Sequence, residues 1–387
     1  MKSIKRRTVY KVAIGLFLLL LVTPNVGLLR EKTNVIHIAL MENRTINPKP
    51  EASFATKKYF QELEDWYNDR LLGRKDMISK WAMWNGRIFD VLISKNVVRG
   101  KDGFLFSPAN MAHEMADKEQ KLTKIKKIEQ QCSKRGIRFI FMMTPNSELV
   151  LSDLFEKEYP LIDLPSAEAV TLSDFQRYGI ETCFLGKDFV SLSLEARKNM
   201  YHTGDYHWTD AAGYLAAKKF LHQVGYAENI DAPVRQIKNV TKAGGYYRDA
   251  GLEIKEDERY APWNDHFVDT FYLTDSRDKD LSQGKLTSSM GEYGQHGEDI
   301  IINPQVKNDR KVLILGDSFS GCLKKYLIQD VHMIIYSHSR DIKKDKGRIN
   351  IEYMLDRYKP DIVLFQKMEA FGYREGFEEM LGNIYVN

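Results

Sequence analysis

The sequence predicts a three-layer α/β/α fold whose sheet is parallel in the main. Helical and strand-like patterns alternate along the chain, and the strand patterns are short and apolar. The clearest strand, residues 312–315, has four aliphatic residues in succession, which is typical of a strand that helices cover on both faces. It is followed by Gly316, Asp317 and Ser318. This turn therefore lies at the carboxyl end of a strand, where such folds place their functional sites.

The alternating elements can be placed in order from residue 100. Residues 100–106 form a turn into the main domain, an amphipathic helix over residues 114–134 ends before Gly136, and a strand over residues 138–143 follows. The same unit of a helix and a strand recurs at 167–178 and 182–185, at 319–328 and 331–336, and at 350–357 and 361–365. The repetition predicts βαβ connections and hence a parallel sheet.

Two stretches depart from this alternation. Residues 57–74 carry Phe60, Leu63, Tyr67 and Leu71 at helical spacing, which predicts a packing helix. Between residues 225 and 311 the sequence is rich in glycine, aspartate and aromatic residues, without sustained periodicity. We expect an insertion at about residues 226–308 that forms a lid or a short-stranded flap.

The N-terminal region predicts a membrane anchor. Residues 12–29 are uncharged and largely apolar, and as a helix they would extend about 27 Å, close to the thickness of a hydrocarbon core. Basic residues precede this segment, which favours a cytoplasmic N-terminus with everything after about residue 30 outside. No Ala-x-Ala-like cleavage site follows, so an uncleaved anchor is favoured over a removed signal peptide.

The expected organisation is therefore a cytoplasmic basic tail (1–11), a transmembrane signal anchor (12–29), an N-terminal helical linker or subdomain (30–99) and a main domain (100–387). The 57 Lys and Arg residues against 53 Asp and Glu give a net charge of +4, and five of the basic residues lie in the tail. The near-neutral remainder argues against nucleic-acid binding. Cys132, Cys183 and Cys322 are too scattered for a metal site or a disulfide framework, so we expect small buried residues.

Ser318 is the candidate nucleophile. Gly316 permits a tight turn, and the helix after Ser318 would direct its N-terminal N–H groups towards the Ser318 oxygen and a developing oxyanion. The alternative interpretation is an ordinary strand-to-helix turn in which Asp317 only caps the helix.

A hydroxyl needs a base, and His207 is the best candidate among the nine histidines. Asp205 lies two residues before it, so in an extended segment the two side chains share one side and the carboxylate can orient the imidazole. The alternative is a surface loop in which Trp208 fills the core. His202, Asp205 and His207 lack a fourth ligand at a recognisable spacing, so we expect no metal, and no cofactor motif is visible.

Asp-x-His-Trp before a helix, and a later strand that ends in Gly-Asp-Ser-Phe-Ser, resemble the SGNH-hydrolase-like domains of alginate O-acetyltransferases of the AlgX and AlgJ type and the related DHHW proteins. The order of the two motifs is inverted relative to ordinary SGNH hydrolases, which implies a circularly permuted core. Similar motifs also occur at residues 100–106 (GKDGFLF) and at residues 41–44 (MENR) with Pro48 and Pro50, so the resemblance runs from about residue 40 to the end. The chain departs from the family at Gln366 and Ala370, where many relatives are acidic.

The resemblance implies Ser318 as nucleophile, His207 as base and Asp205 as its orienting acid. Residues expected to hold the oxyanion or substrate are Gly316, Asn146, Gln366, Trp208, Tyr246, Tyr247 and Arg248. Asn146 and Gln366 lie at or just past predicted strand ends. The aromatic and polar residues of the insertion, Trp263 included, suit a carbohydrate; alternatively, they only fasten a long loop.

The resemblance also implies transfer of an acetyl group through a Ser318-linked acyl-enzyme onto hydroxyls of an exopolysaccharide or cell-wall glycan. A separate polytopic membrane-bound O-acyltransferase would supply the acetyl group. Two alternatives remain open, a membrane-tethered carbohydrate acetyl esterase and a non-catalytic glycan-binding or assembly protein of the same fold.

Overall fold

The structure is a computed structural model, and it divides the chain into two compact units. The larger comprises Asn96–Tyr246 and Ile254–Asn387, and the smaller comprises Met1–Lys95 and Tyr247–Glu253. The structure describes residues 2–22, 47–54, 56–71, 77, 80, 81, 84, 97–107, 110, 118–155, 163–233, 235–242, 244–250, 252, 256–263, 267, 271–274, 285–287, 298–338, 349–368, 381, 384 and 385.

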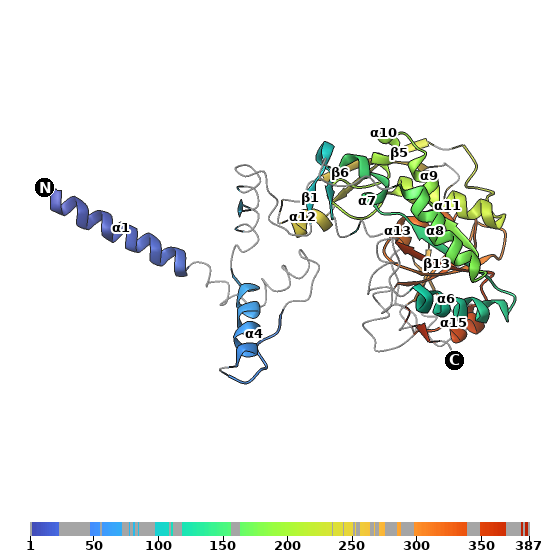
Figure 1. The fold of residues 1–387 in the computed structure, drawn as a ribbon, viewed down its shortest axis with the longest axis horizontal. Helices are drawn as coiled ribbons and strands as arrows, with labels where there is room; N and C mark the ends of the chain where they lie inside the picture. The colour runs from blue at the N-terminus through green and yellow to red at the C-terminus, as the bar shows by residue number, and fades with distance from the viewer. Residues whose placement is uncertain are drawn as a thin grey trace. The chain divides into compact units, whose positions relative to one another are not determined.

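An eight-stranded sheet forms the centre of the larger unit (Figure 1). Five parallel strands come first in its order: β4 (Thr182–Phe184), β3 (Arg138–Thr144), β13 (Ile362–Met368), β10 (Lys311–Gly316) and β11 (Met333–His338). Three antiparallel strands continue it: β9 (Glu298–Ile302), β7 (Phe271–Thr274) and β8 (Lys285–Thr287). The predicted α/β fold with a mostly parallel sheet is confirmed.

The central strand β10 is buried because helices cover both faces of the sheet. Val312 and Ile314 face a core formed with α11 (Asp210–Val224) and α13 (Ser320–Leu327). Leu313 and Leu315 face a second core, formed with α6 (Lys118–Ser133), α8 (Leu164–Arg177) and α15 (Ile351–Tyr358). Helices α6 and α15 lie side by side on that face (Figure 1). Each fully buried aliphatic side chain of this kind stabilises the fold by about 1.5–3 kcal/mol.

Residues 226–308, the expected insertion, contain more regular structure than their sequence indicated. Strands β5 (Arg235–Lys242) and β6 (Glu256–Trp263) pair antiparallel as a separate two-stranded sheet, and α12 spans Gly245–Asp249 between them. Strand β9 belongs to the central sheet, where its Ile300 pairs with Ile335 of β11. The stretch thus contributes the antiparallel end of the sheet as well as a hairpin.

The remaining described elements are short. They are β1 (Val98–Arg99) paired with β2 (Leu105–Phe106), the turn of 3-10 helix Lys101–Gly103, α7 (Ser147–Val150), a second 3-10 turn at Ser152–Leu154, α9 (Gly186–Val190), α10 (Leu194–Asn199), and β12 (Ile349–Asn350) paired with β14 (Ile384–Tyr385). Cys132 and Cys183 are buried as expected, whereas Cys322 is only half-buried; all three are free thiols.

The smaller unit contains helices α1 (Lys2–Val22) and α4 (Lys57–Asn68). Thr56 caps α4 through its hydroxyl oxygen, which accepts a hydrogen bond from the N–H of Tyr59. The helix is shorter than the predicted 57–74, and none of its residues is buried among the described parts of the chain.

Of the predicted membrane segment 12–29, residues 23–29 lie outside the described residues. Among the described helices, none combines the length and the apolar character that crossing a membrane requires.

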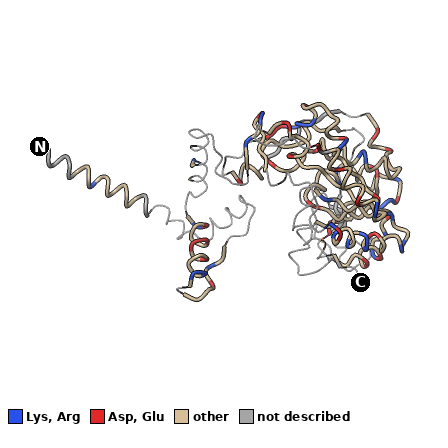
Figure 2. The backbone as a smooth tube through the Cα atoms, viewed as in Figure 1, with Lys and Arg blue, Asp and Glu red and all other residues tan. Residues whose placement is uncertain are grey.

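Charge is evenly mixed over the larger unit. Segments with basic residues and segments with acidic residues are interspersed along the larger unit (Figure 2). This pattern agrees with the small net charge of the sequence.

Candidate active site

The turn after β10 is held tightly against the neighbouring strand β13. The Oε1 atom of Gln366 accepts hydrogen bonds from the N–H of Asp317 (3.2 Å) and from the hydroxyl of Ser320 (2.6 Å). A Cβ at Gly316 would lie 2.2 Å from Ser320 Oγ, so this close approach requires glycine. Gly316 and Gln366 therefore shape the turn. Gln366 is buried and its Oε1 is engaged in these internal bonds, so its contact with substrate stays a prediction.

Asp317 fastens the same turn a second time. One oxygen of its buried carboxylate accepts from the N–H of Phe319 (3.0 Å), as in an Asx turn, and the other accepts from the N–H of Met368 (2.7 Å). The Nζ of Lys367 lies 3.8 Å from that second oxygen. Among the described residues, no group accepts from the N–H of Ser318, so it is available to an oxyanion.

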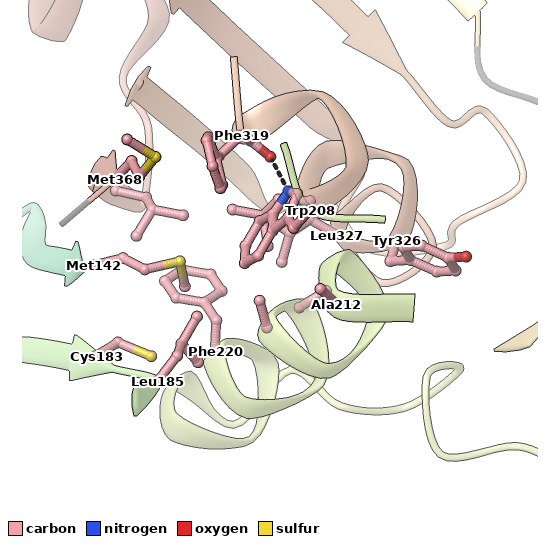
Figure 3. Close-up of a cluster of buried hydrophobic side chains, with 14 of the residues drawn as sticks. Met142, Cys183, Leu185, Trp208, Ala212, Phe220, Phe319, Tyr326, Leu327 and Met368 are labelled. Atoms are coloured by element: carbon pink, nitrogen blue, oxygen red, sulfur yellow. Dashed lines mark hydrogen bonds between the residues drawn. The ribbon is translucent and has the colours of Figure 1, made fainter. Parts of the chain in front are cut away.

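A short loop, closed at its base by a β-bridge, carries His207. Tyr201 and Trp208 form an isolated antiparallel bridge, and the intervening residues include Asp205 and His207. Trp208 is 1% exposed and donates its indole N–H to the carbonyl oxygen of Phe319 (2.9 Å), as Figure 3 shows. Trp208 thus packs in the core and ties the loop to the nucleophile turn. Its predicted contact with substrate stays a prediction, and the buried position agrees with the alternative that Trp208 fills the core.

Asp205, His207 and Ser318 form a continuous chain of hydrogen bonds. His207 Nδ1 lies 2.6 Å from Asp205 Oδ1, and His207 Nε2 lies 2.7 Å from Ser318 Oγ. The imidazole is 29% exposed and the Asp205 side chain 13%, so the relay opens to solvent on the histidine and serine side. This is the arrangement by which a carboxylate orients a base and the base takes a proton from a hydroxyl.

The surroundings of the Asp205 carboxylate favour its ionised form. Burial alone would raise its pKa, but the hydrogen bond and charge of His207 and the backbone N–H groups outweigh burial and lower the pKa well below its usual value. Gly244 and Gly245 donate their N–H groups to Oδ2 at 3.0 and 2.7 Å. Oδ1 receives the N–H of His207 in addition to its ring (2.9 Å). The carboxylate therefore holds a fixed orientation and a full negative charge.

Two aromatic rings enclose the imidazole. The Tyr206 ring lies 4.3 Å from the His207 ring between centroids, and the Phe319 ring lies 5.5 Å from it. Sequence reasoning missed both residues, although each adjoins a predicted one in the chain. Their positions beside His207 and Ser318 were the signal that could have identified them.

Asn146 lies at the carboxyl end of β3 and is fully buried. Its amide Nδ2 donates to the carbonyl oxygen of Asn110 (3.1 Å) and to Glu148 Oε2 (2.7 Å), while its Oδ1 has no partner among the described groups. Both amide hydrogens are therefore engaged, and donation to an oxyanion would require one of these bonds to break.

The other predicted binding residues have different surroundings. Tyr246 is buried and its hydroxyl contacts Glu148 and Asn110. Tyr247 is buried and belongs to the smaller unit. The backbone of Arg248 lies in α12, and its side chain lies outside the described residues. His202 directs its ring at Asp257 (3.2 Å) instead of joining the relay.

The α/β fold and the hydrogen-bonded chain Asp205–His207–Ser318 agree with the arrangement that the resemblance implied. Residues 97–248 match the family described as SGNH hydrolase-like domain, acetyltransferase AlgX. The predicted resemblance to this family is thereby confirmed over residues 97–248. Asp205 and His207 lie inside the matched segment, whereas Ser318 lies beyond it.

Solved structures show the same fold at low sequence identity. PatB1 from Bacillus cereus is 15% identical, with a TM-score of 0.53 over 73% of this chain and 98% of that one. Its structure with a sulfonyl adduct is 16% identical, with a TM-score of 0.52 over 74% and 99%. A DHHW family protein from Eubacterium siraeum is 14% identical, with a TM-score of 0.52 over 76% and 100%. No curated protein matches the sequence.

Proposed function

We propose that this protein is an O-acetyltransferase that carries the acetyl group on Ser318. The observation that carries the proposal is the hydrogen-bonded chain Asp205–His207–Ser318, whose two links measure 2.6 and 2.7 Å. The match to an acetyltransferase-type domain supports the same reaction class.

In the first half-reaction, Ser318 Oγ attacks the carbonyl carbon of an acetyl donor and its proton passes to His207 Nε2. The carbonyl oxygen becomes an oxyanion, and the free N–H of Ser318 is placed to donate to it. Collapse of this intermediate breaks the bond to the leaving group, which takes the proton from His207. The acetyl group is then esterified to Ser318. Asp205 stabilises the imidazolium of His207 while it holds the proton.

In the second half-reaction, an acceptor hydroxyl gives its proton to His207 and attacks the acetyl-serine. Collapse restores the Ser318 hydroxyl with that proton and releases the acetylated acceptor. Water in the acceptor position would make the same site an esterase, so the outcome depends on how the pocket orients a hydroxyl and excludes water.

For the acceptor we propose an exopolysaccharide or cell-wall glycan, and for the donor partner a membrane-bound O-acyltransferase that brings acetyl groups across the bilayer. Both proposals rest on the resemblance of the sequence motifs to those of the alginate O-acetyltransferases. We further propose that the N-terminal segment tethers the protein to the cell membrane with its catalytic domain outside, on the basis of the basic tail and the apolar residues 12–29.

The test is to incubate the full chain with p-nitrophenyl acetate, with and without oligosaccharide acceptors, and to analyse the products by mass spectrometry. Acetylated oligosaccharide that depends on Ser318 supports the proposal. Free acetate alone would identify an esterase, and oligosaccharide binding without turnover would identify a non-catalytic protein.

A further inference from the structure

Glu148 is a buried carboxylate outside the proposed relay. It is 0% exposed and lies in α7, directly after β3. An isolated carboxylate is costly to bury, so donors must surround it. Those donors are the N–H of Ser107 (2.9 Å), Nδ2 of Asn110 (3.3 Å) and the hydroxyl of Tyr246 on Oε1, with Nδ2 of Asn146 (2.7 Å) and the hydroxyl of Ser147 (3.2 Å) on Oε2. Glu148 thus joins three separate segments of the chain.

The contact from Tyr246 has a fixed direction. Burial and the nearby charge of Glu148 raise the pKa of Tyr246 well above its usual value, so the hydroxyl stays protonated. It therefore donates a hydrogen bond to the carboxylate of Glu148. The same hydroxyl accepts from Asn110 Nδ2 (2.9 Å). Tyr246 is therefore held at the end of its side chain by two buried polar groups.

The backbone before Tyr246 reaches the relay. The N–H groups of Gly244 and Gly245 donate to Asp205 Oδ2, and the N–H of Tyr246 donates to the carbonyl oxygen of Gly204 (3.0 Å). A Cβ at Gly245 would lie 2.7 Å from the Tyr206 ring, so this segment lies directly against the aspartate loop. Three successive N–H groups are thus directed at residues 204 and 205.

Side-chain packing makes a second connection. The Tyr246 and Tyr206 rings meet edge to face with centroids 5.9 Å apart, and the Tyr206 ring covers the imidazole of His207. Displacement of Tyr246 would therefore disturb both the carboxylate and the imidazole.

We propose that the Glu148–Tyr246 hydrogen bond positions the relay by holding the Gly244 and Gly245 N–H groups on Asp205. Glu148 and Tyr246 are then positioning residues, which act through Asp205 without touching substrate. This inference rests on the proposed function, because it assigns them a role in the same reaction.

Tyr246→Phe in the full chain is the direct test, since it removes the hydroxyl and keeps the ring against Tyr206. The expected result is a fall in kcat of about tenfold to a hundredfold with KM almost unchanged. The 2.6 Å link between His207 and Asp205 should give a far-downfield proton resonance that His207→Ala abolishes, and in Tyr246→Phe this resonance should shift or broaden.

Tyr358→Phe is the matched control. Tyr358 also donates to a buried glutamate, Glu298 (2.5 Å), but packs in the core on the opposite face of the sheet. This variant should lower the melting temperature as Tyr246→Phe does, and it should leave kcat and the downfield resonance unchanged.

Glu148→Gln provides a second variant should Tyr246→Phe fold poorly. Loss of kcat by Glu148→Gln, and a double variant no worse than the poorer single one, would support the proposal. Normal kcat and an unshifted resonance in a folded variant, or losses that multiply in the double variant, would overturn it. Ser318→Ala distinguishes failure of the positioning role from failure of the proposed function. If Ser318→Ala keeps its activity, the proposed function itself is wrong.

Discussion

The indole N–H of Trp208 donates to the carbonyl oxygen of Phe319 over 2.9 Å, and the two residues are the immediate neighbours of His207 and Ser318. Both side chains are buried, and their rings lie 5.3 Å apart (Figure 3). The distance between base and hydroxyl is thus set by a rigid contact in the core behind them. Two residues 111 positions apart in the chain are in this way held within hydrogen-bond reach.

Trp208→Phe should weaken this connection. The variant leaves the Phe319 carbonyl without its donor and opens a space beside it, so we expect a loss of about 2–4 kcal/mol in the free energy of unfolding and a lower kcat. Urea unfolding and acetyl-ester turnover measure the two effects. Trp66→Phe is the control: it makes the same change of side chain but breaks no indole hydrogen bond, because the buried Trp66 indole N–H has no partner among the described groups. Equal kcat in the wild type and Trp208→Phe would contradict the role given to Trp208.

Gly316→Ala should disturb the nucleophile turn. Its Cβ would meet Ser320 Oγ at 2.2 Å and Gln366 Oε1 at 2.9 Å, so the turn must shift, at a cost of about 1–3 kcal/mol and with loss of activity. Gly321→Ala, five residues on in helix α13, meets nothing within 4 Å and should be neutral or stabilising by up to about 1 kcal/mol. Thermal melting and turnover of both variants check this contrast. Similar behaviour of the two would refute the tight packing at Gly316.

Asp205→Asn should lower kcat by about ten-thousandfold, because the amide cannot stabilise the imidazolium or fix its tautomer. Acid stability should change as well. The pKa of Asp205 is lower in the folded state than its ordinary value of 3.8, so its ionised form contributes stability above that pH, and the contribution is lost as the pH falls below it. Melting temperatures between about pH 5 and pH 2 should therefore fall more steeply for the wild type than for Asp205→Asn. Parallel curves would show that Asp205 has an ordinary pKa.

Thiol reagents should leave the activity intact. Burial raises the pKa of Cys132 and of Cys183 to about 12, and it raises that of Cys322 as well, so almost no thiolate is present at neutral pH. Iodoacetamide at neutral pH should therefore not inactivate the protein, whereas a sulfonyl fluoride should do so by modifying Ser318. Inactivation by iodoacetamide with protection by an acetyl ester would point to a cysteine nucleophile.

The parallel part of the sheet could be predicted because its strands are runs of apolar residues, which is the pattern of a strand buried on both faces. The aliphatic run 312–315 became β10 (Lys311–Gly316), and the run beginning at residue 138 became β3 (Arg138–Thr144). Strand β9 (Glu298–Ile302) was missed although Ile300, Ile301 and Ile302 form a short apolar run, because the run is brief and follows a stretch rich in glycine, aspartate and aromatic residues. Its place in the sheet comes from antiparallel pairing with β11, a partner that the local sequence does not indicate.

The candidate site divides in the same way. Asp205, His207 and Ser318 could be identified because their side chains carry recognisable chemistry. The Gly244 and Gly245 donors could not, because a backbone N–H is common to nearly every residue and these lie about forty positions from the carboxylate. Trp208 and Gln366 were predicted to contact substrate or the oxyanion, and the structure adds that both side chains are buried.

The most direct test of the account is to trap the acyl-enzyme. The full chain is treated briefly with p-nitrophenyl acetate, quenched in acid, digested and sequenced by tandem mass spectrometry. We predict one acetyl group on Ser318 in the wild type and none on that residue in His207→Ala, which keeps the hydroxyl but lacks the base. Stoichiometric acetylation of another residue, or equal labelling of Ser318 without His207, would contradict the proposed relay.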